Sequence, residues 1–394
     1  MAGPRHATTG SDAVTLEQLL AAKEVVVTCG SGGVGKTTTA AALATMATLH
    51  LGGRVLVLTV DPARRLADAL GLEGIGNTER PVSVATFAAA GLKPKGELWT
   101  AMLDTKASWD DLVRRHAPDE KTRDAILANP LYENVTAQFI QSHDYIAIER
   151  LHELHASGRF DLIVVDTPPT RNALDLLDAP GRMEEFFGGR LLKWLTAPIR
   201  NRLVGAASRP FLTMADRILG AHFLQDISEF FVLLQSMEGG FVERAQQVSR
   251  VLTDSRSTFC VVTTLEPAAA HEAAFFVDEL HRRKLHLGAV IVNKTLPSYL
   301  QEDGPDAAAD KLRDGADAIG AALADLVDAP AARVSRVLSE VADSFDNYAV
   351  VAKREAEQRT ELAVAADVLV TVPILDEPIN DLAGLVRLGE TCWR

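Results

Sequence analysis

A glycine-rich turn between an apolar run and a helix-like run is the feature that most limits how this chain can fold. The run at residues 24–29 is apolar and β-branched, as in a buried strand. The residues that follow the turn are rich in alanine and threonine and lack Asp, Glu, Lys and Arg. The turn fits the pattern GxxxxGK[ST], which forms a phosphate-binding loop where it follows a strand and opens a helix. It consists of Gly30, Ser31, Gly32, Gly33, Val34, Gly35, Lys36, Thr37 and Thr38.

The residue types of this turn predict a site for ATP and Mg²⁺. Glycines reach backbone angles that other residues avoid, and they let the loop amides approach phosphate oxygens without a Cβ in the way. The start of the following helix adds a favourable dipole. We expect Lys36 to neutralise charge on the β- and γ-phosphates and the Thr37 hydroxyl to bind Mg²⁺. The competing interpretation is a glycine loop that merely turns the chain, and the strand–helix setting argues against it.

Two aspartates stand at the ends of predicted strands. Asp166 ends the run at residues 161–166 and is placed to reach Mg²⁺ through a water molecule. The alternative for Asp166 is a carboxylate that caps the next turn. Asp61 follows the run at residues 54–60, where it could orient the attacking water or be an ordinary turn aspartate before proline. Residue chemistry alone leaves the role of Asp61 open.

Short apolar runs recur along the chain and predict an α/β fold. Most are continuous rather than alternating, which is typical of strands buried on both faces of a parallel sheet. Helical patterns separate the runs, so we expect a doubly wound, mostly parallel sheet of the P-loop NTPase class with an inserted helical subdomain. The predicted strands are residues 24–29, 54–60, 98–103, 161–166, 258–264, 287–293 and 367–372.

Long helical segments interrupt this alternation. We expect a flexible N-terminus at residues 1–14 and a single ATPase domain at residues 15–394, with helical insertions at about 105–159 and 173–256. The second insertion is strongly apolar, and its apolar side chains recur near the helical period. On the residues alone, packing of these helices against the sheet is the simplest interpretation. Residues 301–332 are rich in alanine and aspartate and predict a solvated helix or linker.

The composition narrows the class of protein. The net charge is -13, and nucleic-acid-binding surfaces are basic, so no nucleic-acid partner is expected. Three widely spaced cysteines exclude a disulfide framework and a CxxC zinc site within the chain, which indicates a reducing, cytoplasmic setting. The polar N-terminus lacks the apolar segment of a signal peptide. The longest uncharged stretch, residues 37–53, predicts a buried helix, so we do not expect an integral membrane protein.

Taken together, the motifs resemble those of the ArsA-type ATPases. This family includes the arsenite-pump motor and the eukaryotic ATPase that targets tail-anchored membrane proteins. The glycine loop is similar to the deviant Walker A motif of the family, and the likeness runs in order from about residue 25 to residue 385. The other similar segments are the switch I-like residues 61–66, the switch II-like residues 166–171, and two late segments on the adenine side, residues 290–296 and 372–375.

The resemblance implies a Mg²⁺-dependent ATPase that forms a dimer around its nucleotides. Its helical subdomains would form a composite groove for a hydrophobic protein client or a membrane-protein partner, which is the alternative to plain core packing. It further implies that Asp61 positions the attacking water and that Asn293 and Pro373 contact adenine. Asp61 and Lys36 are then the expected catalytic residues, and Thr37 and Asp166 are the expected metal ligands.

Position 31 departs from the family pattern. Family members carry a signature lysine there that reaches the nucleotide of the partner subunit, whereas this chain has Ser31. The cysteines that bind metalloids or an interfacial zinc in some members are also missing. Our leading hypothesis is an ATPase, either a homodimer or a heterodimer with a paralogue, whose nucleotide state opens and closes the helical subdomain. The alternative is a nucleotide-binding regulatory or scaffold subunit with little turnover, acting with a paralogue that retains the lysine.

Overall fold

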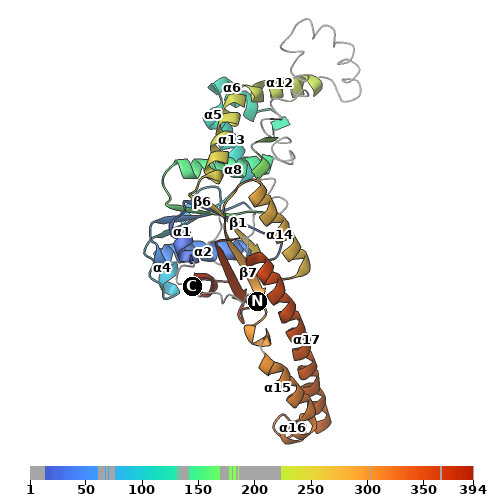
Figure 1. Cartoon of the computed structure of the whole chain (residues 1–394). Coiled ribbons are helices and arrows are strands. Elements are labelled where there is room, and N and C mark those ends of the chain that lie inside the picture. Colours follow the sequence, from blue (N-terminus) through green and yellow to red (C-terminus); the bar gives the residue numbers. More distant parts are fainter. Residues whose placement is uncertain are drawn as a thin grey trace, which may run out of the picture.

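The computed structural model describes residues 14–60, 67, 70, 76–129, 131–132, 142–168, 177–179, 181–182, 185, 223–301, 303–363 and 366–393. At its centre is an eight-stranded sheet with the order β3-β4-β2-β5-β1-β6-β7-β8 (Figure 1). Neighbouring strands run parallel except β3 and β4, which pair antiparallel. The strands are β1 Val25–Cys29, β2 Arg54–Thr59, β3 Arg80–Pro81, β4 Glu97–Met102, β5 Leu162–Asp166, β6 Ser257–Thr263, β7 Leu287–Thr295 and β8 Val368–Pro373.

The burial of the strands confirms the interpretation of the apolar runs. Every residue of the central strands β1, β5 and β6 is buried, because helices cover both faces of the sheet. All seven predicted strands are present, with ends that differ by one or two residues. The two-residue edge strand β3 was not predicted, since it is too short to leave a pattern. At the other edge, β8 alternates between buried and half-buried residues.

Each face of the sheet has its own apolar core. Val25 and Val27 belong to one core and Val26 to the other, as the alternation of side chains along a strand requires. Helices α5, α8, α13 and α14 contribute to the first core, and helices α1, α2, α4 and α18 contribute to the second. The chain therefore forms the expected doubly wound α/β fold. The bounds are α1 Leu16–Ala21, α2 Lys36–His50, α4 Val84–Ala89, α14 Pro267–Arg282 and α18 Leu382–Trp393.

In the described part of the chain, five helices gather at one end of the molecule and fall within the two predicted insertions (Figure 1). Phe230 and Leu234 are buried in the first apolar core, which favours core packing for this part of the second insertion. Residues 186–222, where the groove alternative places much of its apolar surface, lie outside the described residues. The helices are α5 Thr105–His116, α6 Glu120–Leu127, α8 Ser142–Ala156, α12 Phe223–Gln235 and α13 Glu238–Thr253.

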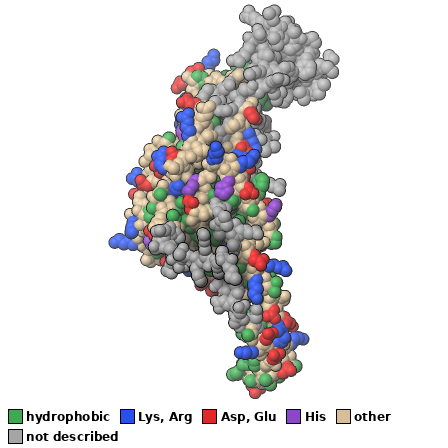
Figure 2. Space-filling model, in the orientation of Figure 1, with side chains coloured by type: hydrophobic (Ala, Val, Ile, Leu, Met, Phe, Trp, Pro, Cys, Tyr) green, Lys and Arg blue, Asp and Glu red, His purple; other side chains and the backbone are tan. Residues whose placement is uncertain are grey.

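A second helical projection points away from the sheet at the opposite end (Figure 1). It consists of α15 Asp303–Asp314, α16 Ala316–Leu323 and the 33-residue α17 Ala331–Ala363, after the short 3-10 helix η1 Ser298–Gln301. Small buried residues of α17, such as Ala342, Ala349 and Ala352, form its packed face. Charged side chains of both signs cover the projection (Figure 2). The sequence predicted a solvated helix or linker at residues 301–332, but it did not predict α17.

Of the helices in the described part of the chain, none combines the length and apolar character needed to cross a membrane.

Candidate nucleotide-binding site

The glycine loop joins the carboxyl end of β1 to the start of α2, as the sequence predicts. Gly35 is the N-cap of α2 and has a φ of 98°, in the left-handed region that glycine tolerates best. A Cβ at Gly35 would lie 2.5 Å from Asn293 Nδ2, and a Cβ at Gly30 would lie 2.0 Å from Val262 O. A side chain at Gly30 would displace the backbone of β6, and a side chain at Gly35 would displace the side chain of Asn293. The loop is therefore a cradle whose shape depends on its glycines.

The lysine of the loop is folded back onto the loop itself. Lys36 is buried, and its Nζ donates a hydrogen bond to Ser31 O at 2.9 Å. The side chain of Ser31 is also buried, and its hydroxyl oxygen has no hydrogen-bond partner in the described structure. The ammonium group thus lies against the concave side of the cradle, where an anionic ligand would be bound.

A cavity of about 500 Å³ opens beside the loop. Its volume lies in the range of small-molecule sites. One part is lined by Gly33, Gly35, Thr37 and Thr38 of the loop, and another by Asn293 and Pro373, so the cavity brings together residues that the sequence assigned to phosphates and to adenine. Apolar residues of the segment after β8 and of α18 complete the wall, including Ile379, Leu385 and Leu388. The lining thus combines polar groups with apolar side chains, and this combination suits a phosphate chain joined to a base.

Asp166 ends β5, the strand next to β1. It is fully buried and pairs in register with Thr28 of β1 and Thr59 of β2. Thr59 Oγ1 donates to Asp166 Oδ2 at 2.8 Å, and Thr167 Oγ1 donates to Thr28 O at 2.8 Å. Hydroxyl and carboxylate oxygens are the hard ligands that Mg²⁺ prefers, so Thr37 with Asp166 is a donor set that fits this ion.

Asn293 and Lys294 approach the loop from the end of β7. The pairing of β7 with β8 shifts between Val292 and Thr295, so these two residues lie in an irregular stretch of the strand. Asn293 Nδ2 donates to Val34 O at 2.8 Å, and Lys294 Nζ donates to Gly33 O at 3.0 Å. The sequence predicted an adenine contact for Asn293, and the structure places it at the junction of the loop and the cavity. The sequence assigned no role to Lys294.

Comparison with known proteins bears on this site. The family model described as anion-transporting ATPase, the ArsA type, matches residues 23–314. The chain belongs to this family. The match covers the loop and β1 to β7 of this chain, and it confirms the resemblance found in the motifs.

Individual relatives of this chain are distant. A Chlorobaculum tepidum protein named as an arsenical pump-driving ATPase is 24% identical over 268 residues, which are 68% of this chain and 60% of that protein. The chain thus matches about three fifths of the length of that relative. The ATPase get3 of Schizosaccharomyces japonicus is 25% identical over 72% of this chain and 78% of its own length. An ATPase ASNA1 homolog of Leishmania infantum is 33% identical over 44% of this chain and 47% of its own length.

The predicted catalytic residue of this ATPase-family chain, Asp61, lies outside the described residues, as do residues 169–171 of the switch II-like segment. The structure does describe the residue before Asp61. The backbone N–H of Val60 donates to Asp166 O at 3.0 Å. The chain therefore leaves β2 beside Asp166, at the edge of the sheet that carries the loop, and the role of Asp61 stays a prediction.

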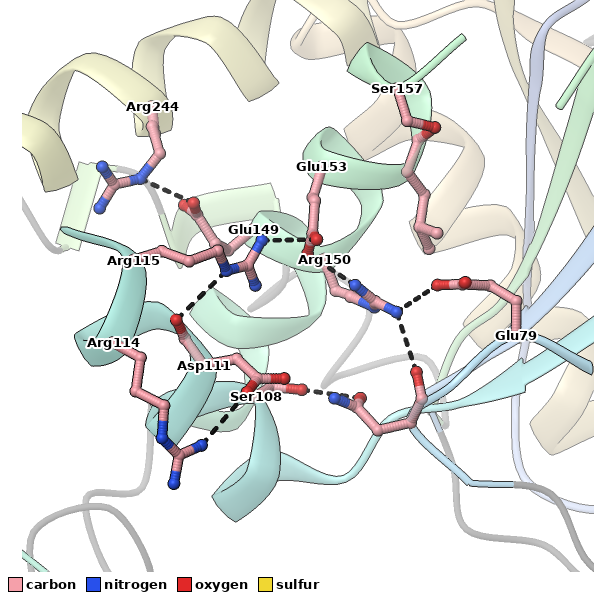
Figure 3. A network of polar contacts seen from close by, with 12 residues as sticks. Glu79, Ser108, Asp111, Arg114, Arg115, Glu149, Arg150, Glu153, Ser157 and Arg244 are labelled. Atoms are coloured by element: carbon pink, nitrogen blue, oxygen red, sulfur yellow. Dashed lines mark hydrogen bonds and ion pairs between the residues drawn. The ribbon is translucent and has the colours of Figure 1, made fainter. Parts of the chain in front are cut away.

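A network of charged side chains joins the segment before β3 to helices α5 and α8 (Figure 3). Arg150 of α8 donates to Asn77 O at 2.9 Å and pairs with Glu79 and Glu153. Ser108 of α5 donates to Asn77 Oδ1 at 2.8 Å. The side chains of Arg150 and Glu79 are nearly buried, so removal of one partner would leave a buried charge without compensation. Residues 77–79, which follow the Asp61 segment along the chain, are therefore held against α5 and α8.

The same network continues into α13. Arg244 lies 2.6 Å from Glu149 Oε1, and the hydroxyl of Tyr145 donates to Glu149 Oε2 at 3.0 Å. Burial raises the pKa of Glu149, although the charge of Arg244 opposes the rise. Burial, together with the positive charge of Arg244, lowers the pKa of His116 to about 4, so His116 is neutral near pH 7. Helices α5, α8 and α13 are therefore joined by buried polar contacts as well as by apolar packing.

Proposed function

We propose that this chain binds Mg-ATP in the cavity beside the glycine loop and hydrolyses it. The observation that carries the proposal is the convergence of the loop, Thr37 and Asp166 on the carboxyl edge of neighbouring parallel strands, next to a cavity that also contains Asn293 and Pro373. In open α/β sheets ligands bind at this edge. Membership of an ATPase family supports the same activity.

Each group has a role in the proposed reaction. Lys36 and the loop amides bind the β- and γ-phosphates, and Thr37 and Asp166 hold Mg²⁺. Bound Mg²⁺ neutralises charge on the phosphate oxygens. Asn293 and Pro373 contact the base. Asp61 orients the attacking water and accepts its proton. The protein contributes mainly by positioning and by electrostatic stabilisation.

We further propose that the protein works as a dimer whose helices respond to the nucleotide. The family resemblance implies the dimer, and the network of Figure 3 supports the response of the helices, because it connects Asn77 and Glu79, which follow the Asp61 segment, to α5, α8 and α13. A shift of the Asp61 segment on hydrolysis would then move these helices. The domain is a single ATPase unit whose insertions at about 105–159 and 173–256 take up a hydrophobic client or a membrane-protein partner. The resemblance to the ATPase that targets tail-anchored membrane proteins favours a protein client.

A role with arsenicals is not supported by the thiols of this chain. Soft metals and metalloids bind thiolates, and the three cysteines are free and buried. Burial raises the pKa of Cys29 well above its usual value and raises those of Cys260 and Cys392 to about 12. The thiols therefore stay protonated near pH 7. The activity in the name of the Chlorobaculum tepidum relative is not part of our proposal.

The proposal predicts Mg²⁺-dependent phosphate release by the pure protein. ATP with Mg²⁺ should be hydrolysed, and chelation of Mg²⁺ with EDTA should stop the release, because Thr37 is neutral and Asp166 is acidic, so without the metal these two residues supply no positive charge to the transferred phosphoryl group. Saturating ATP should also raise the melting temperature, since a ligand at 100 times its Kd adds about 2.7 kcal/mol. Absence of both effects contradicts the proposed function.

A second candidate is a nucleotide-binding regulatory or scaffold subunit that needs a paralogue for turnover. It is favoured by Ser31, whose short, uncharged and buried side chain cannot reach across a subunit interface. A rise in melting temperature with ATP, without phosphate release by the protein alone, would support this candidate. Stimulation by a paralogue that carries the lysine would establish it.

Replacement of Ser31 by lysine tests the importance of the missing cation. We expect S31K to raise the steady-state hydrolysis rate of the dimer by about 10-fold or more, because a cation supplied across an interface contributes about 10³–10⁵ in related phosphoryl transfers. S31Q is the matched control, since it adds length without charge. If the S31K dimer is intact and no faster, and no paralogue stimulates the wild type, the argument from Ser31 is wrong.

A further inference from the structure

Lys294 has an unusual backbone at the rim of the cavity. Its φ is 56°, in the left-handed region that glycine, asparagine and aspartate occupy more readily than lysine. It lies where the pairing of β7 with β8 shifts between Val292 and Thr295. Irregularities of this kind redirect a side chain near functional sites. Lys294 therefore has a backbone conformation of higher free energy than usual, and this conformation sets the direction of its side chain.

Contacts from three sides fix this conformation. The N–H of Lys294 donates to Asn293 Oδ1 at 2.9 Å. The N–H of Ile374 donates to Thr295 O at 3.1 Å, and the N–H of Leu296 donates to Glu355 Oε2 at 3.1 Å. The last contact comes from α17, the long helix of the projection. A strained residue persists where its surroundings determine it in this way.

The result is a cation at the phosphate end of the cavity. Lys294 Nζ donates to Gly33 O at 3.0 Å, and Lys36 Nζ donates to Ser31 O at 2.9 Å, so two ammonium groups are bonded to carbonyls of the same loop. Among the described residues that line the cavity, Lys294 is the one with a positive charge. A lysine that served only to hold the loop carbonyl would not need this charge or this backbone. Asn293 already provides a neutral contact of that kind to Val34 O.

We propose that Lys294 is a second phosphate-binding cation, acting on the nucleotide bound by its own chain. The proposal rests on the proposed function, because it requires a nucleotide in the cavity. On binding, Nζ exchanges its hydrogen bond to Gly33 O for one to a phosphate oxygen. Lys36 makes the equivalent exchange from Ser31 O. The side chain of Lys294 is exposed, so the exchange needs only rotation about its side-chain bonds.

Calorimetric titration of K294Q with Mg-ATP, Mg-ADP and AMP tests this role. We expect the affinity for Mg-ATP to fall by about 10-fold, as for loss of one charged hydrogen bond. The loss should decrease from ATP to ADP to AMP, because the interaction depends on phosphate charge. K294R should retain most of the affinity. K294G removes the charge and relieves the strained backbone, so it should bind ATP as weakly as K294Q while melting no lower than the wild type.

Lys95 offers the matched control. Its Nζ also donates to a backbone carbonyl, His50 O at 2.9 Å, but it does not line the cavity. K95Q should bind all three nucleotides like the wild type. An equal loss for ATP, ADP and AMP in K294Q, or wild-type ATP affinity in K294G, overturns the proposal and leaves a structural role. Wild-type affinity in a Lys36 variant would instead overturn the nucleotide site itself, so the two failures are distinguishable.

Discussion

Replacing Lys36 by alanine is expected to weaken Mg-ATP binding by about 100-fold or more. The loop residues Gly30 to Thr38 contain one charged side chain, and its Nζ lies within the cradle at 2.9 Å from Ser31 O. Charged hydrogen bonds contribute about 1.5–3 kcal/mol each, and Lys36 would make more than one to the β- and γ-phosphates. Calorimetric titration with Mg-ATP measures the loss, and the rise in melting temperature with ATP should disappear in the same variant.

Lys23 provides the control for Lys36. Its Nζ donates to Ser255 O at 2.7 Å, so K23A also removes a lysine bonded to a backbone carbonyl, but away from the loop. K23A should bind Mg-ATP like the wild type. Thermal melting without nucleotide shows whether K36A is folded, which is needed because Lys36 is only 7% exposed. A folded K36A protein with unchanged affinity would remove the basis for the phosphate-site assignment.

The sequence was sufficient for the sheet because parallel strands are buried on both faces. Such strands need apolar residues at successive positions, so runs like Val25–Cys29 and Leu162–Asp166 stand out between helical patterns. The edge strand β3 has two exposed residues, so it does not require apolar residues and leaves no apolar run in the sequence. Helix α17 was missed for a related reason. Its packed face is made of Ala342, Ala349 and Ala352, which give a weak hydrophobic pattern.

The candidate site was predictable only where one local motif determines it. The glycine loop combines strand, turn and helix within one segment, so its place in the fold followed from the sequence. Thr59 and Asp166 are 107 residues apart along the chain, and their contact depends on the pairing of β2 with β5. The orientation of Lys294 depends on an irregular register between β7 and β8. A register shift between two strands leaves no recognisable pattern in the sequence of either strand. The structure was therefore needed to identify Lys294 as a second cation beside the cavity.

Replacing Asp61 by asparagine is expected to preserve ATP binding and to slow hydrolysis by about 10²–10⁴-fold. An amide has nearly the shape of the carboxylate but cannot accept the proton of the attacking water, and proton transfer by a positioned side chain contributes this much to a rate. The N–H of Val60, the residue before Asp61, donates to Asp166 O, so the chain leaves β2 close to the proposed Mg²⁺ site. Single-turnover phosphate release, with the enzyme in excess over ATP, isolates this step from product release.

The control for Asp61 is an aspartate at the other end of β5. Asp161 Oδ2 accepts a hydrogen bond from Arg54 N at 2.7 Å, at the amino edge of the sheet and away from the loop. D161N should hydrolyse ATP at the wild-type rate, because asparagine can still accept this bond. D61N should bind Mg-ATP with the affinity of the wild type, whereas K36A should bind it weakly. A D61N rate close to that of the wild type would mean that another group positions the water. Weak ATP binding by D61N would mean that Asp61 contributes to the nucleotide site itself.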